Sequence, residues 1–562
     1  AITPVATVAS GVLTGRANMG EKGQSAKGSG DGGRGKAASQ QQQQQQGVGP
    51  LLVCAALCGV SLGVGTYFWN RLKRTSPRFS RLSSKTNWTF VMTKTHVDLL
   101  RKYKAKCAVS ADQLNRITED FIAQMQSGLG EDGGMLKMLP SYVEKMPTGR
   151  EQGEFLAIDL GGTNVRVVKV LLQGGKVKDV VAHEDAIPPA MMRGTTKELF
   201  DFIAKMVQTF IATHAKAEAG AQNGAGESGQ PIPIGFTFSY PMKQTGIRRG
   251  ELICWTKGFD IKDTLGKDLV ELLEASLEEQ GVNGKVFAIL NDTVGTLAAS
   301  KFCDQDTQLG VILGTGSNAA YIEGASRISK LKEKEAAGAG GEGKRKMIIN
   351  IEWGNYNSSH LPYLDEDRAI DAQSLNAGVQ HYEKMISGMY LGEMVRRICL
   401  RASKEINLFG GTQRKFLETA WSFPTSLVSK IDGCAGTGDL DQVEKLLAGT
   451  LKIDPSSVSE SDARFVAELC ALIGKRSAAL AAAGVVAIYK YLVQSGQVDP
   501  KQRFVVAVDG GLFEHYPNYP ERMAETFATL LGEESAKRIE LVHSPDGSGI
   551  GSAVIAAAQA MV

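Results

Sequence analysis

Residues 154–173 read EFLAIDLGGTNVRVVKVLLQ. Apolar residues dominate 154–158 and 165–172, which predicts two strands. The glycine pair between them allows a tight hairpin, and the N–H groups of such a turn can form a cradle for an anion. We therefore expect a strand, a phosphate-binding turn and a second strand, with Asp159 at the end of the first strand to orient a hydrated Mg²⁺ ion.

Further glycine-rich turns occur downstream. LGTGSN at 313–318 and VDGGLF at 508–513 each follow an apolar, strand-like segment, and SPDGSG occupies 544–549. The turns at 161–164 and 313–318 form a matched pair, which predicts a duplicated, two-lobed nucleotide cleft. Neither is a GxxxxGKS/T loop and neither opens a helix as GxGxxG does, so P-loop and Rossmann nucleotide sites are disfavoured.

Strands and helices alternate along the rest of the chain. Residues 196–214 have helical spacing, 232–238 form an apolar strand, and the apolar residues of 114–125 predict a helix that Ser110 caps. This alternation indicates the α/β class. The charged, glycine-rich tract 330–346 lies between two strand-like segments, so we expect a solvated surface insertion there.

Length and composition indicate a globular protein with two core-forming domains and an appendage. The chain has 562 residues, and its 63 Lys and Arg nearly balance its 60 Asp and Glu, so no nucleic-acid partner is implied. The 8 cysteines include no CxxC pair and no His/Cys cluster with metal-ligand spacing. A reduced protein that faces the cytosol, with no protein-held metal centre, fits this pattern best.

The N-terminal segment is predicted to hold a membrane anchor. Residues 1–46 are a low-complexity, disordered segment, and 47–69 carry no charge over a length of about 35 Å if helical, enough to cross a bilayer. Cations at Arg71, Lys73 and Arg74 favour a cytosolic position for the juxtamembrane linker 70–93 and everything after it. A cleaved signal peptide or a buried core helix would also explain the apolar stretch.

Four longer motifs carry a specific resemblance: FTFSYP at 236–241, WTKGF at 255–259, NDTVGT at 291–296 and EKMISGMY at 383–390. With the glycine turns, residues 95–560 resemble the hexokinase family of the sugar kinase, heat-shock protein and actin superfamily. DGGLFEHY at 509–516 and the N-terminal anchor look most like the plant and algal branch. The resemblance implies a two-lobed actin-like (ribonuclease H-like) fold with an interlobe cleft, divided into domains at 94–299 and 300–562.

The implied activity is the first step of glycolysis, the transfer of the γ-phosphoryl group of ATP, with Mg²⁺, to the 6-hydroxyl of glucose or a related hexose such as fructose or mannose. By resemblance Asp292 is the general base, and Lys257 stabilises developing charge. The implied hexose contacts are Ser239, Thr256, Lys257, Asn291, Asp292, Asn318, Glu352, Gln380 and Glu383. The implied nucleotide and Mg²⁺ contacts are Asp159, Gly161, Gly162, Thr163, Asn164, Arg166, Gly314, Thr315, Gly510, Gly511 and Ser544.

The chain departs from the family pattern at Val165, which replaces an aromatic residue, at Tyr240, which replaces a common Phe, and in its long 330–346 insertion. None of these is a proposed catalytic group. Two other functions stay open: a non-catalytic sugar sensor or scaffold, and an actin-like or chaperone-like ATPase. The dense set of sugar contacts argues against the ATPase. The resemblance suggests the mitochondrial or plastid outer membrane as the place of the anchor.

Overall fold

The computed structural model describes residues 92–162, 164–218, 230–255, 258–331, 345–411 and 414–561. These residues belong to one compact unit, Asn87–Val562. The predicted disordered segment 1–46, the anchor 47–69, nearly all of the linker 70–93 and most of the insertion 330–346 lie outside the described residues. Those expectations stay predictions.

One sheet has five strands in the order β4-β3-β2-β5-β8. The predicted hairpin is confirmed: β2 pairs with β3 in antiparallel register, and Leu160 lies opposite Val165 at the turn. β4 continues the antiparallel part, whereas β5 and β8 add parallel strands. The strands span Gly153–Leu160 (β2), Asn164–Gln173 (β3), Lys176–Ala186 (β4), Ile232–Phe238 (β5) and Gly284–Leu290 (β8).

The second sheet repeats this topology. Its order is β1-β11-β10-β9-β12-β13, in which β9, β10 and β11 are antiparallel and β12 and β13 add parallel strands. Apart from the short β1, each sheet therefore has the same chain order, which confirms the predicted duplication. The strands span Leu139–Pro140 (β1), Thr307–Leu313 (β9), Ser317–Gly324 (β10), Lys346–Asn350 (β11), Phe504–Asp509 (β12) and Ile539–His543 (β13); a separate hairpin joins Met242–Gly246 (β6) to Arg249–Leu252 (β7).

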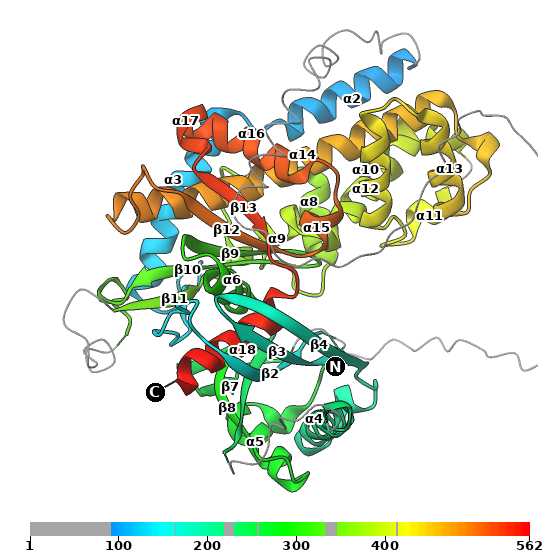
Figure 1. Cartoon of the computed structure of the whole chain (residues 1–562). Coiled ribbons are helices and arrows are strands. Elements are labelled where there is room, and N and C mark those ends of the chain that lie inside the picture. Colours follow the sequence, from blue (N-terminus) through cyan, green and yellow to red (C-terminus); the bar gives the residue numbers. More distant parts are fainter. Residues whose placement is uncertain are drawn as a thin grey trace, which may run out of the picture. The chain divides into compact units, whose positions relative to one another are not determined.

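Helices cover both faces of the five-stranded sheet. Side chains of a strand alternate between faces, and Leu156 and Ile158 of β2 belong to the cluster under α4 and α5, whereas Phe155 and Ala157 belong to the cluster under α18. Figure 1 shows α4 and α5 beside this sheet, and α18 against β2 and β3. The helices span Thr196–Glu218 (α4), Leu269–Glu279 (α5), Asp292–Cys303 (α6) and Gly547–Ala560 (α18).

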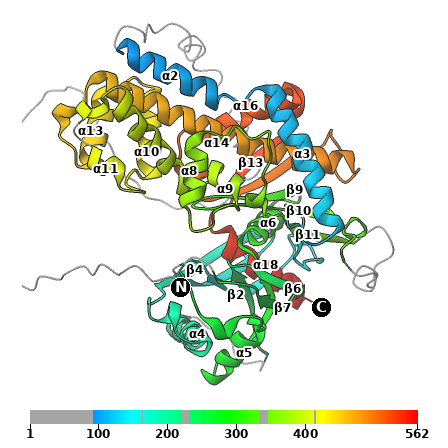
Figure 2. The ribbon, with the colours of Figure 1, turned by 180° about the vertical axis from the view of Figure 1, so that it is seen from behind.

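A long helix, α14 (Glu460–Gln494), forms the centre of the larger hydrophobic cluster. It is the one helix among the described segments that is long and apolar enough to cross a membrane, yet 78% of its apolar window is buried inside the protein. Figures 1 and 2 show α3 and α16 alongside it. The cluster includes side chains of α2 (Lys94–Cys107), α3 (Ala111–Gly130), α8 (Asp365–Gln373), α9 (His381–Ile386), α10 (Gly388–Glu405), α12 (Thr425–Ala435), α13 (Leu440–Leu451) and α16 (Tyr519–Leu531); the shorter helices are α11 (Arg414–Glu418), α15 (Gly511–His515) and α17 (Glu533–Ala536).

The predicted helix after Ser110 is α3, and the hydroxyl of Ser110 accepts a hydrogen bond from the N–H of Gln113 at 3.2 Å. The division into two domains at residue 299 remains a prediction. The hydrophobic clusters, however, contain residues from both sides of this position. α2 and α3 share a core with elements beyond residue 300, while α18, near the C-terminus, packs on β2 and β5.

Two helices, α6 and α18, cross at a pair of glycines. A Cβ added to Gly551 would lie 1.8 Å from the carbonyl oxygen of Gly295, and one added to Gly295 would lie 2.6 Å from that of Ser548. Only glycine permits this approach. As a result the first turns of both helices, which carry predicted site residues or their neighbours, lie against one another.

Candidate active site

The first glycine turn joins β2 to β3, where the N–H of Gly161 donates to the carbonyl of Asn164 at 3.0 Å. The hydroxyl of Tyr240 donates to the carbonyl of Gly161. Tyr240 is thus a departure from the family pattern that adds a hydrogen bond to the first glycine turn. Burial, and then the charge of Asp159, raise the pKa of Tyr240, so it stays a neutral donor.

The second turn, at 314–316, is held from behind by the N-terminus of α10. The N–H groups of Gly388 and Met389 donate to the carbonyls of Gly314 and Thr315 at 2.8 and 3.1 Å. The N–H groups of Thr315 and Gly316 donate to no group in the described part of the chain. They are therefore available to an anion, and the binding of phosphate at this turn stays a prediction.

The third turn packs against the second. Gly510 has φ 114°, and a Cβ there would lie 2.6 Å from the carbonyl carbon of Leu313, so this close approach requires glycine. Gly511 opens α15 and is exposed. Asp509, which precedes both glycines, accepts the N–H of Gly547 at 3.2 Å. Its burial raises the pKa of Asp509 despite the N–H donors of Gly510 and Gly547.

The fourth turn, at 544–549, connects the first and third. Ser548 donates its hydroxyl to Asp159 at 2.8 Å, and Arg166 forms a two-pronged ion pair with Asp546, with 3.0 Å between Nη2 and Oδ2. The N–H of Ser544 donates to Val508 at 3.0 Å. All the glycine turns predicted to bind nucleotide thus meet, although they are far apart in the sequence.

A group of amide and carboxylate side chains lies at the start of β10 and the end of β11. The amide of Asn318 donates to Glu352 at 3.1 Å and to Asn350 at 2.8 Å, and approaches Asn291 at 3.4 Å. Asn350 also donates to Glu352, at 2.9 Å. Three predicted hexose contacts are therefore together, and Asn350 is a member that the sequence analysis missed. Its position two residues before Glu352 was the available signal.

Glu383 lies between this group and the second glycine turn. Its Oε2 accepts the N–H of Ser317 at 2.8 Å, and a Cβ at either Gly316 or Gly354 would come within 3.1 Å of its side chain. Glu352 and Gln380 both have φ 55°, in the left-handed region. This conformation costs free energy for a residue other than glycine, and Glu352 and Gln380 adopt it at the edge of the candidate site.

Asp292 is the first residue of α6, and Asn291 caps the helix by accepting the N–H of Thr293 at 2.9 Å. Oδ1 of Asp292 accepts the same N–H at 2.7 Å and the hydroxyl of Thr293 at 3.1 Å. Oδ2 accepts no hydrogen bond from the described residues. One oxygen of the predicted base is thus held in place while the other can accept a proton.

α6 links the polar group around Asn318 to the glycine turns. At its N-terminus, Asn291 contacts the group of Asn318, and one turn later a Cβ at Gly547 would lie 3.0 Å from Thr296. Ser239 lies beside the first glycine turn, since its N–H donates to Leu160 at 3.3 Å. Three predicted site residues, Thr163, Thr256 and Lys257, lie outside the described residues.

The acidic residues Asp509 and Asp546 were not among the predicted contacts. Each stands immediately before a glycine in one of the quoted turns, as Asp159 stands near the first glycine pair, and that repeated pattern was the signal. No group of three or more His, Cys, Asp or Glu in the described segments could hold a metal ion by itself.

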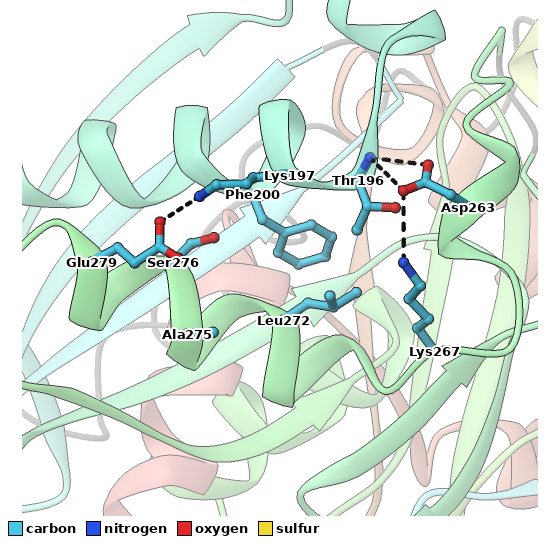
Figure 3. Close-up of a pocket in the computed structure, with 9 residues that line it drawn as sticks. All are labelled: Thr196, Lys197, Phe200, Asp263, Lys267, Leu272, Ala275, Ser276 and Glu279. Atoms are coloured by element: carbon cyan, nitrogen blue, oxygen red, sulfur yellow. Dashed lines mark hydrogen bonds and ion pairs between the residues drawn. The ribbon is translucent and has the colours of Figure 1, made fainter.

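A cavity of about 210 Å³ lies elsewhere, between α4 and α5 (Figure 3). Its charged rim is already paired, since Lys197 contacts Glu279 and Asp201, and Lys267 contacts Asp263 at 3.6 Å. None of the predicted site residues lines it. The lining residues are Thr196, Lys197, Phe200, Asp263, Lys267, Leu272, Ala275, Ser276 and Glu279.

Two sheets of the same topology, whose glycine turns meet at one place, define the actin-like fold of the sugar kinases. Among solved structures, a hexokinase from Schistosoma mansoni complexed with glucose matches with TM-score 0.68 and 33% identity over 82% of this chain and 99% of that one. Another hexokinase crystal structure matches with TM-score 0.68 and 28% identity over 83% and 100%.

Sequence comparison is equally specific. Two hexokinase family models match residues 99–302 and 308–558. Hexokinase-7 of Oryza sativa subsp. japonica is 44% identical over 81% of this chain and 95% of its own length. Hexokinase-1 of Arabidopsis thaliana is 40% identical over 92% and 98%. The chain belongs to the hexokinase family and is of the plant type.

Proposed function

We propose that this protein transfers the γ-phosphoryl group of ATP to the 6-hydroxyl of glucose or a related hexose. The observation that carries the proposal is the position of α6. Its first residue, Asp292, adjoins the amide and carboxylate group around Asn318, and its next turn contacts the glycine turns. Sugar phosphorylation requires a carboxylate placed between the site that binds the sugar hydroxyls and the site that binds the phosphates.

The hexose would lie among the amides and carboxylates of Asn291, Asn318, Glu352 and Glu383. A hexose offers many hydroxyls, each a donor and an acceptor, and a site that excludes water must supply partners of both kinds. Carboxylates accept hydroxyl protons, and the amides can also donate. The group therefore suits a neutral sugar better than an anion.

Asp292 would accept the proton of the 6-hydroxyl as its oxygen attacks the γ-phosphorus. The new bond joins the sugar oxygen to phosphorus, and the bond from phosphorus to the oxygen that bridges the β- and γ-phosphates breaks. That oxygen leaves on ADP. Oδ1 stays bonded to Thr293 during this step, which keeps Oδ2 directed at its substrate.

The N–H groups of Thr315 and Gly316, with Arg166, would bind the phosphate oxygens. Mg²⁺ carried by ATP keeps several of its waters and needs one or two protein carboxylates, so Asp159 beside the first turn fits its demands without a metal cage. Bound there, Mg²⁺ would supply neutralisation of phosphate charge.

A coupled assay of ADP release, run with glucose, fructose and mannose in turn, tests the function directly. We expect ADP release that depends on hexose, and formation of hexose 6-phosphate in equal amount. Hexose binding by calorimetry without any ADP release would instead identify a sugar sensor. No contact among the described residues favours that alternative.

We also propose that residues 47–69 anchor the protein in a membrane, with the kinase body in the cytosol, on the mitochondrial or plastid outer membrane. The length of this uncharged stretch and the cations after it support the proposal. Fractionation of cells that express the full chain, with protease added to intact organelles, tests it. Protection of the kinase body from protease would contradict the orientation.

A further inference from the structure

The loop between α8 and α9, residues 374–380, leads directly to two of the predicted hexose contacts. Gln380 ends it and Glu383 follows one turn later. No side chain of 371–380 is buried, and the apolar residues Leu375 and Val379 are exposed. Hydrophobic packing therefore does not hold this loop, and its position depends on polar contacts.

One buried cation supplies three of those contacts and joins the loop to α8. Lys384 is 5% exposed, and its ammonium donates to Asp371 at 2.7 Å, to the carbonyl of Asn376 at 2.8 Å and to that of Val379 at 2.8 Å. These partners are on the last turn of α8, in the middle of the loop and immediately before Gln380. An ammonium group has three protons, so every donor is used.

The Lys384 side chain acts next to Gln380, where α9 begins. Its ammonium binds the carbonyl that precedes Gln380, while the backbone N–H of residue 384, as in any helix, closes the first turn of α9 on the carbonyl of Gln380 at 3.1 Å. Gln380 is held at φ 55° and ψ 40°, a conformation that costs free energy for a residue other than glycine. Asp371 assists by accepting the N–H of Gly378 at 3.0 Å.

From this geometry we infer that Lys384 is a positioning residue for sugar recognition: it holds loop 374–380 so that Gln380 and Glu383 face the hexose. The inference rests on the proposed function, which assigns the hexose to this site. Lys384 touches neither substrate in this scheme. It acts on hexose affinity through the loop, and the glycine turns that serve ATP are held by other residues.

Kinetics of Lys384→Met test the inference. Loss of a charge-assisted hydrogen bond typically changes an equilibrium by about tenfold or more. We expect the KM and the calorimetric Kd for hexose to rise by about that factor, while the KM for ATP changes by less than about twofold. Asp371→Asn keeps the two carbonyl contacts and should give a smaller rise of the same kind.

Asp367→Asn is the matched control. Asp367 forms a buried ion pair with Arg476 at 2.8 and 2.9 Å, also between α8 and the core, but contacts no predicted site residue. It should lower the unfolding temperature and leave the hexose KM unchanged. If Asp367→Asn and Lys384→Met raised the hexose KM equally, general loosening of the core would explain both and the inference would be wrong.

A double-mutant cycle with Gln380→Ala separates positioning from stability. If Lys384 acts through Gln380, the effects of Lys384→Met and Gln380→Ala on the hexose Kd are not additive in free energy. The Kd of the double variant is then little higher than that of whichever single variant binds hexose less tightly. Independent, multiplicative effects would overturn the inference, as would an unchanged Kd in Lys384→Met. Should Lys384→Met not fold, Lys384→Met with Asp371→Asn removes the unpaired carboxylate and serves in its place.

Failure of the proposed function gives a different result. If the wild-type protein released no ADP with any hexose while calorimetry detected hexose, the kinase proposal would fail and the cycle on Kd would still decide the role of Lys384. If wild-type activity were normal and Lys384→Met matched it, only the positioning role would be lost.

Discussion

Asp292→Asn is the substitution that tests the mechanism most directly. Asn has the same shape as Asp, and its amide oxygen can still accept the two hydrogen bonds that Thr293 donates to Oδ1, from its N–H at 2.7 Å and its hydroxyl at 3.1 Å. At Oδ2 it places an NH₂ group, which cannot take a proton from a hydroxyl. The change therefore removes the base and preserves the local structure.

The expected magnitudes separate chemistry from folding. Loss of general-base catalysis lowers kcat by about 10² to 10⁴-fold, or about 2.7 to 5.5 kcal/mol. The folding cost is smaller: the cap at Asn291 remains, and loss of a negative charge at a helix N-terminus costs about 0.3 to 1 kcal/mol. We therefore expect a folded protein that binds hexose within a few-fold of wild type and turns over very slowly.

The assay combines thermal unfolding, calorimetry with glucose and single-turnover phosphorylation on the same preparation. Asp268→Asn is the control, because Asp268 caps α5 by accepting two N–H bonds and lies outside the site. It should lose stability and keep kcat. A folded Asp292→Asn protein with near-normal kcat would refute the assignment of Asp292 as the base.

Three further predictions concern the sugar site, pH and the anchor. Glu352→Ala removes the acceptor of Asn318 and Asn350, so the hexose KM should rise about 10- to 100-fold with the ATP KM nearly constant; steady-state kinetics check this, and an equal rise in both would contradict it. Burial acts to raise the pKa of Glu393, but hydrogen bonds from Arg396 and from the N–H of Trp421, with the arginine charges, outweigh it and lower the pKa. Glu393 therefore stabilises the fold above the ordinary Glu pKa, and this contribution is lost as pH falls through the lowered value, so the stability gap between wild type and Glu393→Gln should close in acid; a gap independent of pH in thermal unfolding would argue against this. Deletion of residues 1–75 should move the protein to the soluble fraction with hexose KM unchanged, whereas a folded but inactive product would show that the segment supports the site.

The local units of the fold could be predicted from the residue pattern alone. The hairpin at 154–173, the helix capped by Ser110 and the α/β class follow from the spacing of apolar residues and glycines, because side chains two, three or four positions apart decide which face of a strand or helix is buried. The long motifs also identified the family, which the relatives and solved structures confirm.

How those units combine depends on contacts between distant parts of the chain. Asp159 and Ser548 are 389 positions apart, and Arg166 and Asp546 are 380 apart, so no periodicity could pair them. Asn350 and Asp509 had a local signal that was missed, whereas the role of Lys384 follows only from the folded loop, which brings Asp371 and two carbonyls to its ammonium. Such pairs depend on packing, because burial in the folded chain makes an unpaired polar group costly and so favours the arrangement in which these groups find partners.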